Sequence, residues 1–192
     1  MGGVGIDLGK RLARRFRWID PGPDVTHLVS DVSGWWRDAE ILAGLGPALA
    51  EPFRADRPTV VVSPEVTGLL LGPLVAVALG AGFVPAYKDG GDRWIAEPTT
   101  WAETDADYRG RRLRLGVRDR HLTPGDRVLV VDDWIATGAQ ARALHRLIAA
   151  RGAEPVGTAA VVADCPPELV AELRLHALLT ADALDPDRAD TA

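Results

Sequence analysis

Residues 132–140 combine the side chains and the backbone pattern needed to hold a sugar phosphate. The segment opens on two adjacent carboxylates, Asp132 and Asp133, and continues into the turn Ala136-Thr137-Gly138. Adjacent side chains point in different directions, so one carboxylate can hold ligand hydroxyls or a hydrated Mg²⁺ while its neighbour orients it. The turn leads into a helical pattern, and the first backbone N–H groups of a helix are free to bind phosphate. The pattern predicts a sugar-phosphate site, and a capped strand–helix junction with two solvated aspartates is the alternative.

The segment directly before the acid pair predicts a buried strand. Residues 127–131 form an apolar run without polar alternation, and residues 59–62 and 156–162 are two further runs of this type. Such runs are typical of strands that are covered on both faces, as in a parallel sheet. In open sheets of this kind, ligands bind where the strands end at their carboxyl side. The acid pair therefore lies where chemistry is expected.

Helical patterns separate these strands. We expect helices over residues 68–79, 138–150 and 167–173, an amphipathic helix over about 8–19, and one over 38–53 that is interrupted or ended near 44–47. A short strand is expected over 83–87. Strands alternating with helices predict an α/β fold with a doubly wound, mostly parallel sheet flanked by helices.

The connection from Lys88 to Thr123 is long for a compact domain. It holds an alternating stretch, Leu113, Leu115 and Val117, which predicts a strand. Two interpretations stay open: a lid that closes on a ligand, and an irregular packed insertion. Six arginines between residues 109 and 120 are interpreted as the outward face of this excursion, which would attract polyphosphate.

Composition bounds the class of protein. The chain has 192 residues, 47% hydrophobic and 26% charged, which fits one globular domain. Its net charge of -5 gives no reason to expect nucleic acid or an anionic membrane as partner. The apolar stretch 66–87 contains several Gly and Pro residues, so we expect a buried helix and strand there, with no membrane span. The lone Cys165 suits a reducing cytoplasm.

Two tryptophan positions could provide a flat surface for a heterocycle. Trp134 follows the acid pair, and Trp35 and Trp36 are adjacent near the N-terminus. Aromatic rings stack on planar bases, although core packing and a subunit contact are equally consistent with each position. His145 is expected on the surface of the helix after the phosphate turn.

The segment 128–138, VLVVDDWIATG, resembles the phosphoribosyl pyrophosphate (PRPP) signature of type I phosphoribosyltransferases. The segments 63–68 and 82–88 are similar to the adenine phosphoribosyltransferase branch, and 28–32 resembles weakly the part that closes over the base. The resemblance implies a single domain over residues 1–182, with a hood over about 1–56 and a flexible lid over about 89–122. We expect the acidic tail, 183–192, to be frayed.

The resemblance implies a Mg²⁺-dependent transfer of 5-phosphoribosyl from PRPP to a nitrogen of a purine-like base, with release of pyrophosphate. Asp132 and Asp133 would hold the ribose hydroxyls and, through PRPP and water, the metal. Lys88 and Asp107 would be the catalytic residues, and the protein would be a homodimer. The other implied PRPP-binding positions are Glu65, Thr67, Gly68, Ala136, Thr137, Gly138, Ala139 and Gln140. The implied base-binding positions are Val29, Ser30 and Trp134.

The chain departs from the family pattern at three places. Thr67 stands where the pyrophosphate loop usually has Arg, which removes a strong donor. Gln140 ends a phosphate loop that usually ends in Thr, and Ser30 replaces an Arg of the hood. These departures leave two alternatives to a purine phosphoribosyltransferase: a non-catalytic PRPP-binding sensor, and a phosphoribosyltransferase for a specialised non-purine heterocycle.

Overall fold

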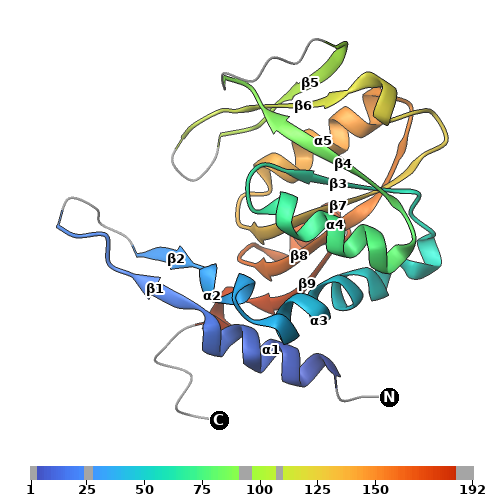
Figure 1. The fold of residues 1–192 in the computed structure, drawn as a ribbon. Helices are drawn as coiled ribbons and strands as arrows, with labels where there is room; N and C mark the ends of the chain where they lie inside the picture. The colour runs from blue at the N-terminus through green and yellow to red at the C-terminus, as the bar shows by residue number, and fades with distance from the viewer. Residues whose placement is uncertain (1–3, 24–27, 91–96, 107–109, 185–192) are drawn as a thin grey trace.

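The computed structural model describes residues 4–23, 28–90, 97–106 and 110–184 (Figure 1). Its central sheet has the strand order β5-β6-β4-β3-β7-β8-β9, in which β4, β3, β7, β8 and β9 are parallel neighbours. The strands are β3 (Val60–Pro64), β4 (Gly82–Lys88), β5 (Thr99–Glu103), β6 (Arg114–Arg118), β7 (Arg127–Ile135), β8 (Glu154–Ala163) and β9 (Leu175–Thr180). The predicted α/β fold with a mostly parallel, helix-flanked sheet is confirmed.

Helices pack on both faces of the sheet (Figure 1). The α-helices are α1 (Val4–Arg15), α2 (Ser33–Trp36), α3 (Ala39–Ala50), α4 (Gly68–Leu79), α5 (Ala139–Ala150) and α6 (Pro167–Glu172). Short 3-10 helices span Glu51–Asp56, Asp119–His121 and Ala181–Leu184.

The apolar strand runs serve two cores at once. Val61 and Leu129 point to the core that contains α1, α3 and α4. Val60 and Val130 point to the opposite core, where Leu144 and other residues of α5 pack. Successive strand side chains alternate between faces, so a strand buried on both sides is apolar at every position. This arrangement explains why the runs show no polar alternation.

The helix expected over 38–53 is one continuous α-helix as far as Ala50, so the predicted interruption near 44–47 is wrong. Pro47 lies inside α3, and Gly46 permits a close approach to α4. A Cβ on Gly46 would lie 2.5 Å from the Leu74 carbonyl oxygen. Gly46 therefore allows α3 to pack closely against α4. Interpreting it as a helix breaker led to the wrong prediction.

The long connection contains a hairpin that extends the sheet. β6 pairs antiparallel with both β4 and β5. The ring of Trp101 covers Gly116, where a Cβ would come within 2.5 Å of the ring, and the Arg114 guanidinium lies 5.3 Å from the ring centroid. The strand expected around Leu113–Val117 is present, whereas β5 and β9 were not anticipated. Trp94, Asp107 and Arg109 lie outside the described residues.

The N-terminal part of the expected hood contains a small two-stranded sheet. β1 (Arg17–Ile19) pairs antiparallel with β2 (Val29–Asp31). The Trp18 indole N–H donates to the Leu184 carbonyl at 3.1 Å, which ties this sheet to the residues that follow β9. Leu184 is buried, and residues 185–192 of the expected tail lie outside the described part of the chain.

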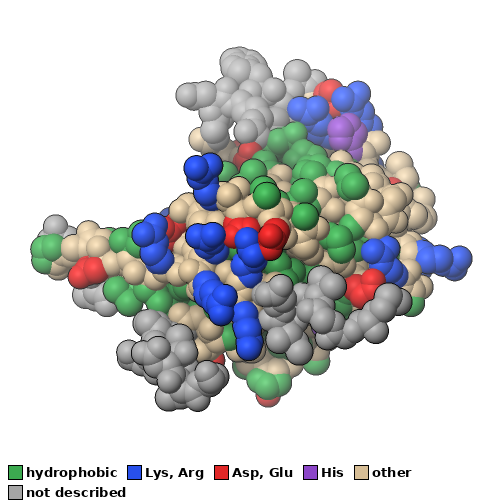
Figure 2. All heavy atoms as spheres, turned by 60° about the horizontal axis from the view of Figure 1, so that its bottom comes forward, with side chains coloured by type: hydrophobic (Ala, Val, Ile, Leu, Met, Phe, Trp, Pro, Cys, Tyr) green, Lys and Arg blue, Asp and Glu red, His purple; other side chains and the backbone are tan. Residues whose placement is uncertain are grey.

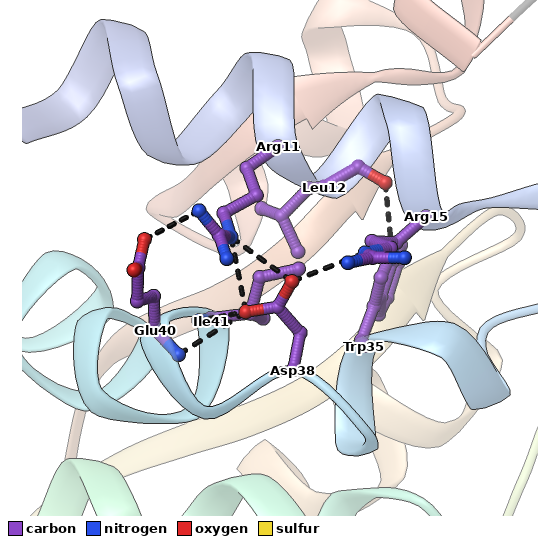
Figure 3. A network of polar contacts seen from close by, with 7 residues as sticks. All are labelled: Arg11, Leu12, Arg15, Trp35, Asp38, Glu40 and Ile41. Carbon is purple, nitrogen blue, oxygen red and sulfur yellow. Dashed lines mark hydrogen bonds and ion pairs between the residues drawn. The ribbon is translucent and has the colours of Figure 1, made fainter.

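A charge network joins α1 to the start of α3 (Figure 3). Asp38 caps α3 by accepting the N–H groups of Glu40 and Ile41, and it accepts hydrogen bonds from Arg11 at 3.0 Å and Arg15 at 3.1 Å. These interactions, led by the Arg11 hydrogen bond, lower the pKa of Asp38 to about 2. Figure 2 shows that Lys and Arg side chains gather on the face formed by α1, with acidic side chains among them.

The apolar stretch 66–87 folds into α4 and β4. Within the described residues, no helix combines the length and the apolar character needed to cross a membrane.

Candidate functional site

A cavity of about 530 Å³ lies at the carboxyl end of β7 and reaches the neighbouring strands. Strand β4 contributes Lys88, β7 contributes the acid pair, and the residue after β8 contributes Asp164. The cavity is also lined by Trp18, Leu28, Val29, Ser30, Thr104, Arg111, Leu113, Trp134, Ile135, Ala136, Thr137, Gly138, Ala139, Gln140 and Ala141. Segments distant in sequence therefore converge on one site.

The two acidic side chains at the end of β7 differ in environment. Asp132 is buried and Asp133 is half-buried. The Asp133 backbone N–H donates to the Asp132 carboxylate at 3.0 Å. Burial, followed by the neighbouring charge of Asp133, raises the pKa of Asp132, whereas the positive charge of Lys88 acts in the opposite direction. A cationic group that enters the cavity would stabilise the charged form of this pair.

The loop from Ala136 to Gln140 has the geometry expected of an anion cradle. Gly138 has φ of 71° and directly precedes α5, and a Cβ there would lie 2.9 Å from Leu169. Both the positive φ and the close packing therefore require glycine. The Ala139 N–H donates to the Thr137 hydroxyl at 3.3 Å. The helix dipole and the N–H groups at the start of α5 favour a phosphate at this place.

Gln140 adds a side-chain amide to the same loop. Its Oε1 atom is buried and has no hydrogen-bond partner among the described residues. Buried polar atoms are normally paired, and this oxygen can only accept, so it lacks a hydrogen-bond donor among the described residues.

Arg142 fixes the phosphate loop from α5. Its guanidinium makes two 2.7 Å contacts with the Glu172 carboxylate of α6. The same side chain donates to the Thr137 carbonyl at 3.1 Å. The Glu172 hydrogen bond raises the pKa of Arg142, and Arg142 lowers the pKa of Glu172. Sequence reasoning did not find this support, because Glu172 is 30 residues away from Arg142.

The predicted pyrophosphate residues divide into two groups. Lys88 lines the cavity, and its backbone N–H donates to the Glu65 carboxylate at 2.8 Å. Glu65, Thr67 and Gly68 do not belong to the cavity lining. Thr67 is half-buried and immediately precedes α4. The structure thus connects this loop to the cavity through Lys88.

The predicted base-side residues Val29, Ser30 and Trp134 all line the cavity. Trp134 packs edge-on against Trp18, with ring centroids 5.9 Å apart, and Leu28 is 52% exposed. This wall is aromatic and apolar, which suits the faces of a planar heterocycle.

Trp35 takes no part in the cavity. It is fully buried in the core, and its indole N–H donates to the Leu12 carbonyl at 3.0 Å. Of the interpretations left open for Trp35, the structure therefore supports core packing.

His145 was expected on the helix surface, and this expectation is wrong. Its Nε2 atom lies 3.0 Å from the Thr158 hydroxyl of β8, and burial lowers the pKa of the imidazole. The residue faces the sheet because α5 packs directly on β8. It does not line the cavity.

Among the other cavity residues, Leu28 belongs to the segment that resembles the base-closing part and Arg111 to the arginine cluster. The remaining four, Trp18, Thr104, Leu113 and Asp164, were not anticipated as site residues. They come from the β1–β2 sheet, from the ends of the β5–β6 hairpin and from the turn after β8. The rule that ligands bind at the carboxyl ends of strands could have found Asp164, which lies two residues after the predicted strand 156–162. The predicted catalytic Asp107 lies outside the described residues.

The donor set limits how a divalent metal could bind. Across the described ranges, no three His, Cys, Asp or Glu side chains group closely enough to hold a metal ion. Two carboxylates, one of them buried, fit a hydrated ion that is shared with a phosphorylated ligand.

Comparisons with known proteins agree with this geometry. Residues 39–170 match the family model of the phosphoribosyl transferase domain. The chain belongs to this phosphoribosyl transferase family. The matched range covers β3, β7 and the phosphate loop, so the resemblance identified from the PRPP-like signature is confirmed.

Two curated relatives are adenine phosphoribosyltransferases by name. The chain is 35% identical over 141 residues to adenine phosphoribosyltransferase of Desulfitobacterium hafniense, covering 73% of this chain and 79% of the relative. It is 36% identical over 151 residues to adenine phosphoribosyltransferase of Streptomyces coelicolor, covering 79% and 80% respectively.

Solved structures extend the likeness beyond the matched range. Adenine phosphoribosyltransferase from Rhodothermus marinus superimposes with a TM-score of 0.76 at 30% identity, covering 91% of this chain and 99% of that one. The enzyme from Leishmania tarentolae gives a TM-score of 0.77 at 26% identity, covering 93% and 89%. The resemblance to the adenine phosphoribosyltransferase branch is thus confirmed as well.

Proposed function

We propose that this protein transfers the 5-phosphoribosyl group of PRPP to a ring nitrogen of a purine base, releasing pyrophosphate and a purine nucleoside monophosphate. One observation carries the proposal: a single cavity holds an acid pair, an anion-binding helix start, a lysine and an aromatic wall. The reaction needs these four elements together, and the family and the names of the relatives support the same activity.

The proposed roles follow from where charge develops during the transfer. The bond from the anomeric carbon to pyrophosphate lengthens, which leaves positive charge on the ribosyl ring. Asp132 and Asp133 would hold the ribose hydroxyls and stabilise this charge, and the loop 136–140 would bind the 5′-phosphate. Lys88 would neutralise charge on the leaving pyrophosphate, with Glu65, Thr67 and Gly68 shaping the loop beside it.

We propose Mg²⁺ as the cofactor, held by Asp132 and Asp133 through water and through PRPP. Bound there, the ion would neutralise charge on the departing pyrophosphate. The chain's own contribution is a pair of carboxylates, one buried and one half-buried, in a cavity that also binds the sugar.

Adenine is the proposed base. The relatives are adenine phosphoribosyltransferases by name, and Val29, Ser30 and Trp134 provide a wall for a planar ring. Asp107 is proposed as the acid or base of the expected lid over 89–122, which would exclude water while the activated sugar reacts. The division into a hood over about 1–56, a lid and a frayed tail, 183–192, likewise remains a proposal.

We further propose a homodimer in the cytoplasm. Helix α4 is apolar on all sides, and Leu70 and Val77 are 51% and 83% exposed. Exposed apolar helix faces are favourable places for a two-fold contact. A molar mass measured by light scattering during size-exclusion chromatography tests this, and a monomer at working concentration would contradict it.

The activity is tested by pyrophosphate release from PRPP and Mg²⁺ with adenine, hypoxanthine, guanine and several non-purine heterocycles. Release with adenine, and mass-spectrometric detection of AMP, is the expected result. Turnover only with a non-purine heterocycle would replace the proposed base. Calorimetric binding of PRPP by folded protein without any turnover would favour a PRPP sensor and overturn the proposed enzyme.

A further inference from the structure

We propose that Asp164 selects the base, by accepting a hydrogen bond from an amino group on the heterocycle. The proposal rests on the proposed phosphoribosyl transfer and names the feature of the base that the site recognises. The base would then be an amino-substituted purine, and the edge that carries its amino group would face β8.

Asp164 has a fixed position at the end of β8. Ala163, the last residue of β8, pairs with Ile135 of β7, and the Asp164 backbone N–H donates to the Ile135 carbonyl at 2.8 Å. The backbone of Asp164 is therefore anchored one residue before the phosphate loop begins at Ala136, and the residue lines the same cavity as that loop.

The strand order separates Asp164 from the leaving-group side. Lys88 ends β4 on one side of β7, and Asp164 follows β8 on the other side. In a displacement at the anomeric carbon, the nucleophile enters opposite the bond that breaks. Pyrophosphate near Lys88 and ribose over the Asp132–Asp133 pair thus place the incoming base toward β8.

The β1–β2 sheet supports this placement of the base. Trp18 contacts Trp134 and donates to Leu184, which lies in the segment directly after β9. The aromatic wall therefore stands on the β8–β9 side of the cavity, where Asp164 also lies. A ring held against Trp18 and Trp134 by its faces presents only its edge to a polar group.

The Asp164 carboxylate can accept a hydrogen bond from the edge of such a ring. Among the described residues, no hydrogen bond or ion pair of this carboxylate is present. The Leu28 side chain has no hydrogen-bonding group, and the indole N–H of Trp18 already donates to the Leu184 carbonyl. An ionised carboxylate only accepts hydrogen bonds, so it favours an amino group over a hydrogen atom and disfavours a carbonyl oxygen.

Catalytic comparison of three bases tests the assignment. Adenine and unsubstituted purine differ by the amino group alone, and hypoxanthine carries a carbonyl in its place. The wild-type protein should prefer adenine to purine in kcat/KM by about 10- to 100-fold, the range expected for a hydrogen bond to a charged group. Asp164→Leu should reduce this preference to about threefold or less, because the acceptor is removed.

Asp164→Asn provides a second, directional readout. An amide can donate as well as accept, so this variant should raise the kcat/KM of hypoxanthine relative to adenine by about tenfold. Glu168→Gln is the matched control, because it neutralises an exposed acid of α6 four residues away that does not line the cavity. The control should leave all base ratios within about twofold of the wild type.

A binding measurement separates this proposal from the proposed function. Calorimetry compares AMP with purine riboside 5′-monophosphate and needs no catalysis. Tighter binding of AMP that is lost in Asp164→Leu supports the assignment, while equal ratios in wild type and variant overturn it even if adenine is turned over. If no base reacts but AMP discrimination depends on Asp164, the enzyme proposal fails and the recognition role stands.

Discussion

Arg142 and Glu172 form a two-point ion pair in which both N–O distances are 2.7 Å, and Arg142 also donates to the Thr137 carbonyl of the phosphate loop. Arg127 makes a comparable pair with Glu154 at 2.6 Å and donates to the Asp56 carbonyl, at the opposite end of β7. Both arginines thus combine an ion pair with a hydrogen bond to a backbone carbonyl, but Arg142 contacts the phosphate loop and Arg127 contacts Asp56.

Arg142→Met should raise the KM for PRPP by about fivefold or more, because the loop loses the contact that fixes its geometry. The free energy of unfolding should change little, because the Arg142 and Glu172 side chains are partly exposed and exposed ion pairs contribute little stability. Steady-state kinetics with varied PRPP checks this result. Arg127→Met is the matched control and should leave the KM unchanged, so an equal rise in both variants would contradict a specific role for Arg142.

Asp132→Asn and Asp133→Asn should each lower kcat/KM by about 100-fold or more, because a carboxylate facing the positive ribosyl ring becomes a neutral amide. The Asp132 variant should not be less stable than wild type at neutral pH, since burial and Asp133 already disfavour the charge of Asp132. Kinetics combined with thermal unfolding measures both effects. PRPP binding that is unchanged in both variants would point to an unrelated phosphate-binding chemistry.

Lys88→Ala should lower turnover strongly while the protein stays folded, because the side chain that lines the cavity is removed and the backbone N–H that donates to Glu65 is kept. The chain has two lysines, Lys10 and Lys88, and Lys10 is exposed on α1, so Lys10→Ala is the control. The same pair allows a chemical test. PRPP with Mg²⁺ should protect Lys88 from acetylation, measured by mass spectrometry, and equal modification of both lysines with and without PRPP would count against its role.

Asp38→Asn should lower the melting temperature at pH 7, because the amide loses the charge that Arg11 and Arg15 stabilise. The folded pKa of Asp38 is about 2, against 3.8 as the ordinary value. A lowered carboxyl pKa contributes stability above the unfolded pKa, and that contribution falls as pH drops from about 4 towards 2. The difference between wild type and variant should therefore shrink in unfolding experiments from pH 7 to pH 3.

Glu40→Gln is the control for that experiment. Glu40 pairs with Arg11, but its side chain is 73% exposed. Glu40→Gln should therefore lower the melting temperature less than Asp38→Asn does at neutral pH. A pH-independent difference between Asp38→Asn and wild type would show that capping of α3, and not the arginine charges, dominates the contribution of Asp38.

Much of the candidate site could be predicted because it is local in sequence. The acid pair, the turn 136–138 and the start of α5 are consecutive, and the backbone rules for a strand that enters a helix fix their relation. The buried runs at residues 59–62 and 127–131 identified the parallel core for the same reason, since burial on both faces removes polar alternation.

The tertiary structure alone decided which other side chains line the cavity together with this loop. Trp18, Arg111 and Asp164 come from three separate elements, and no spacing in the chain relates them. Gly46 and His145 were misread because a close helix contact and a hydrogen bond to β8 depend on packing partners far away in sequence. The sequence by itself determined the phosphate-binding half of the site, because its geometry is that of one continuous backbone segment. The half that would choose the base was decided by the tertiary fold, because strand order and the docking of β1 and β2 bring its side chains together.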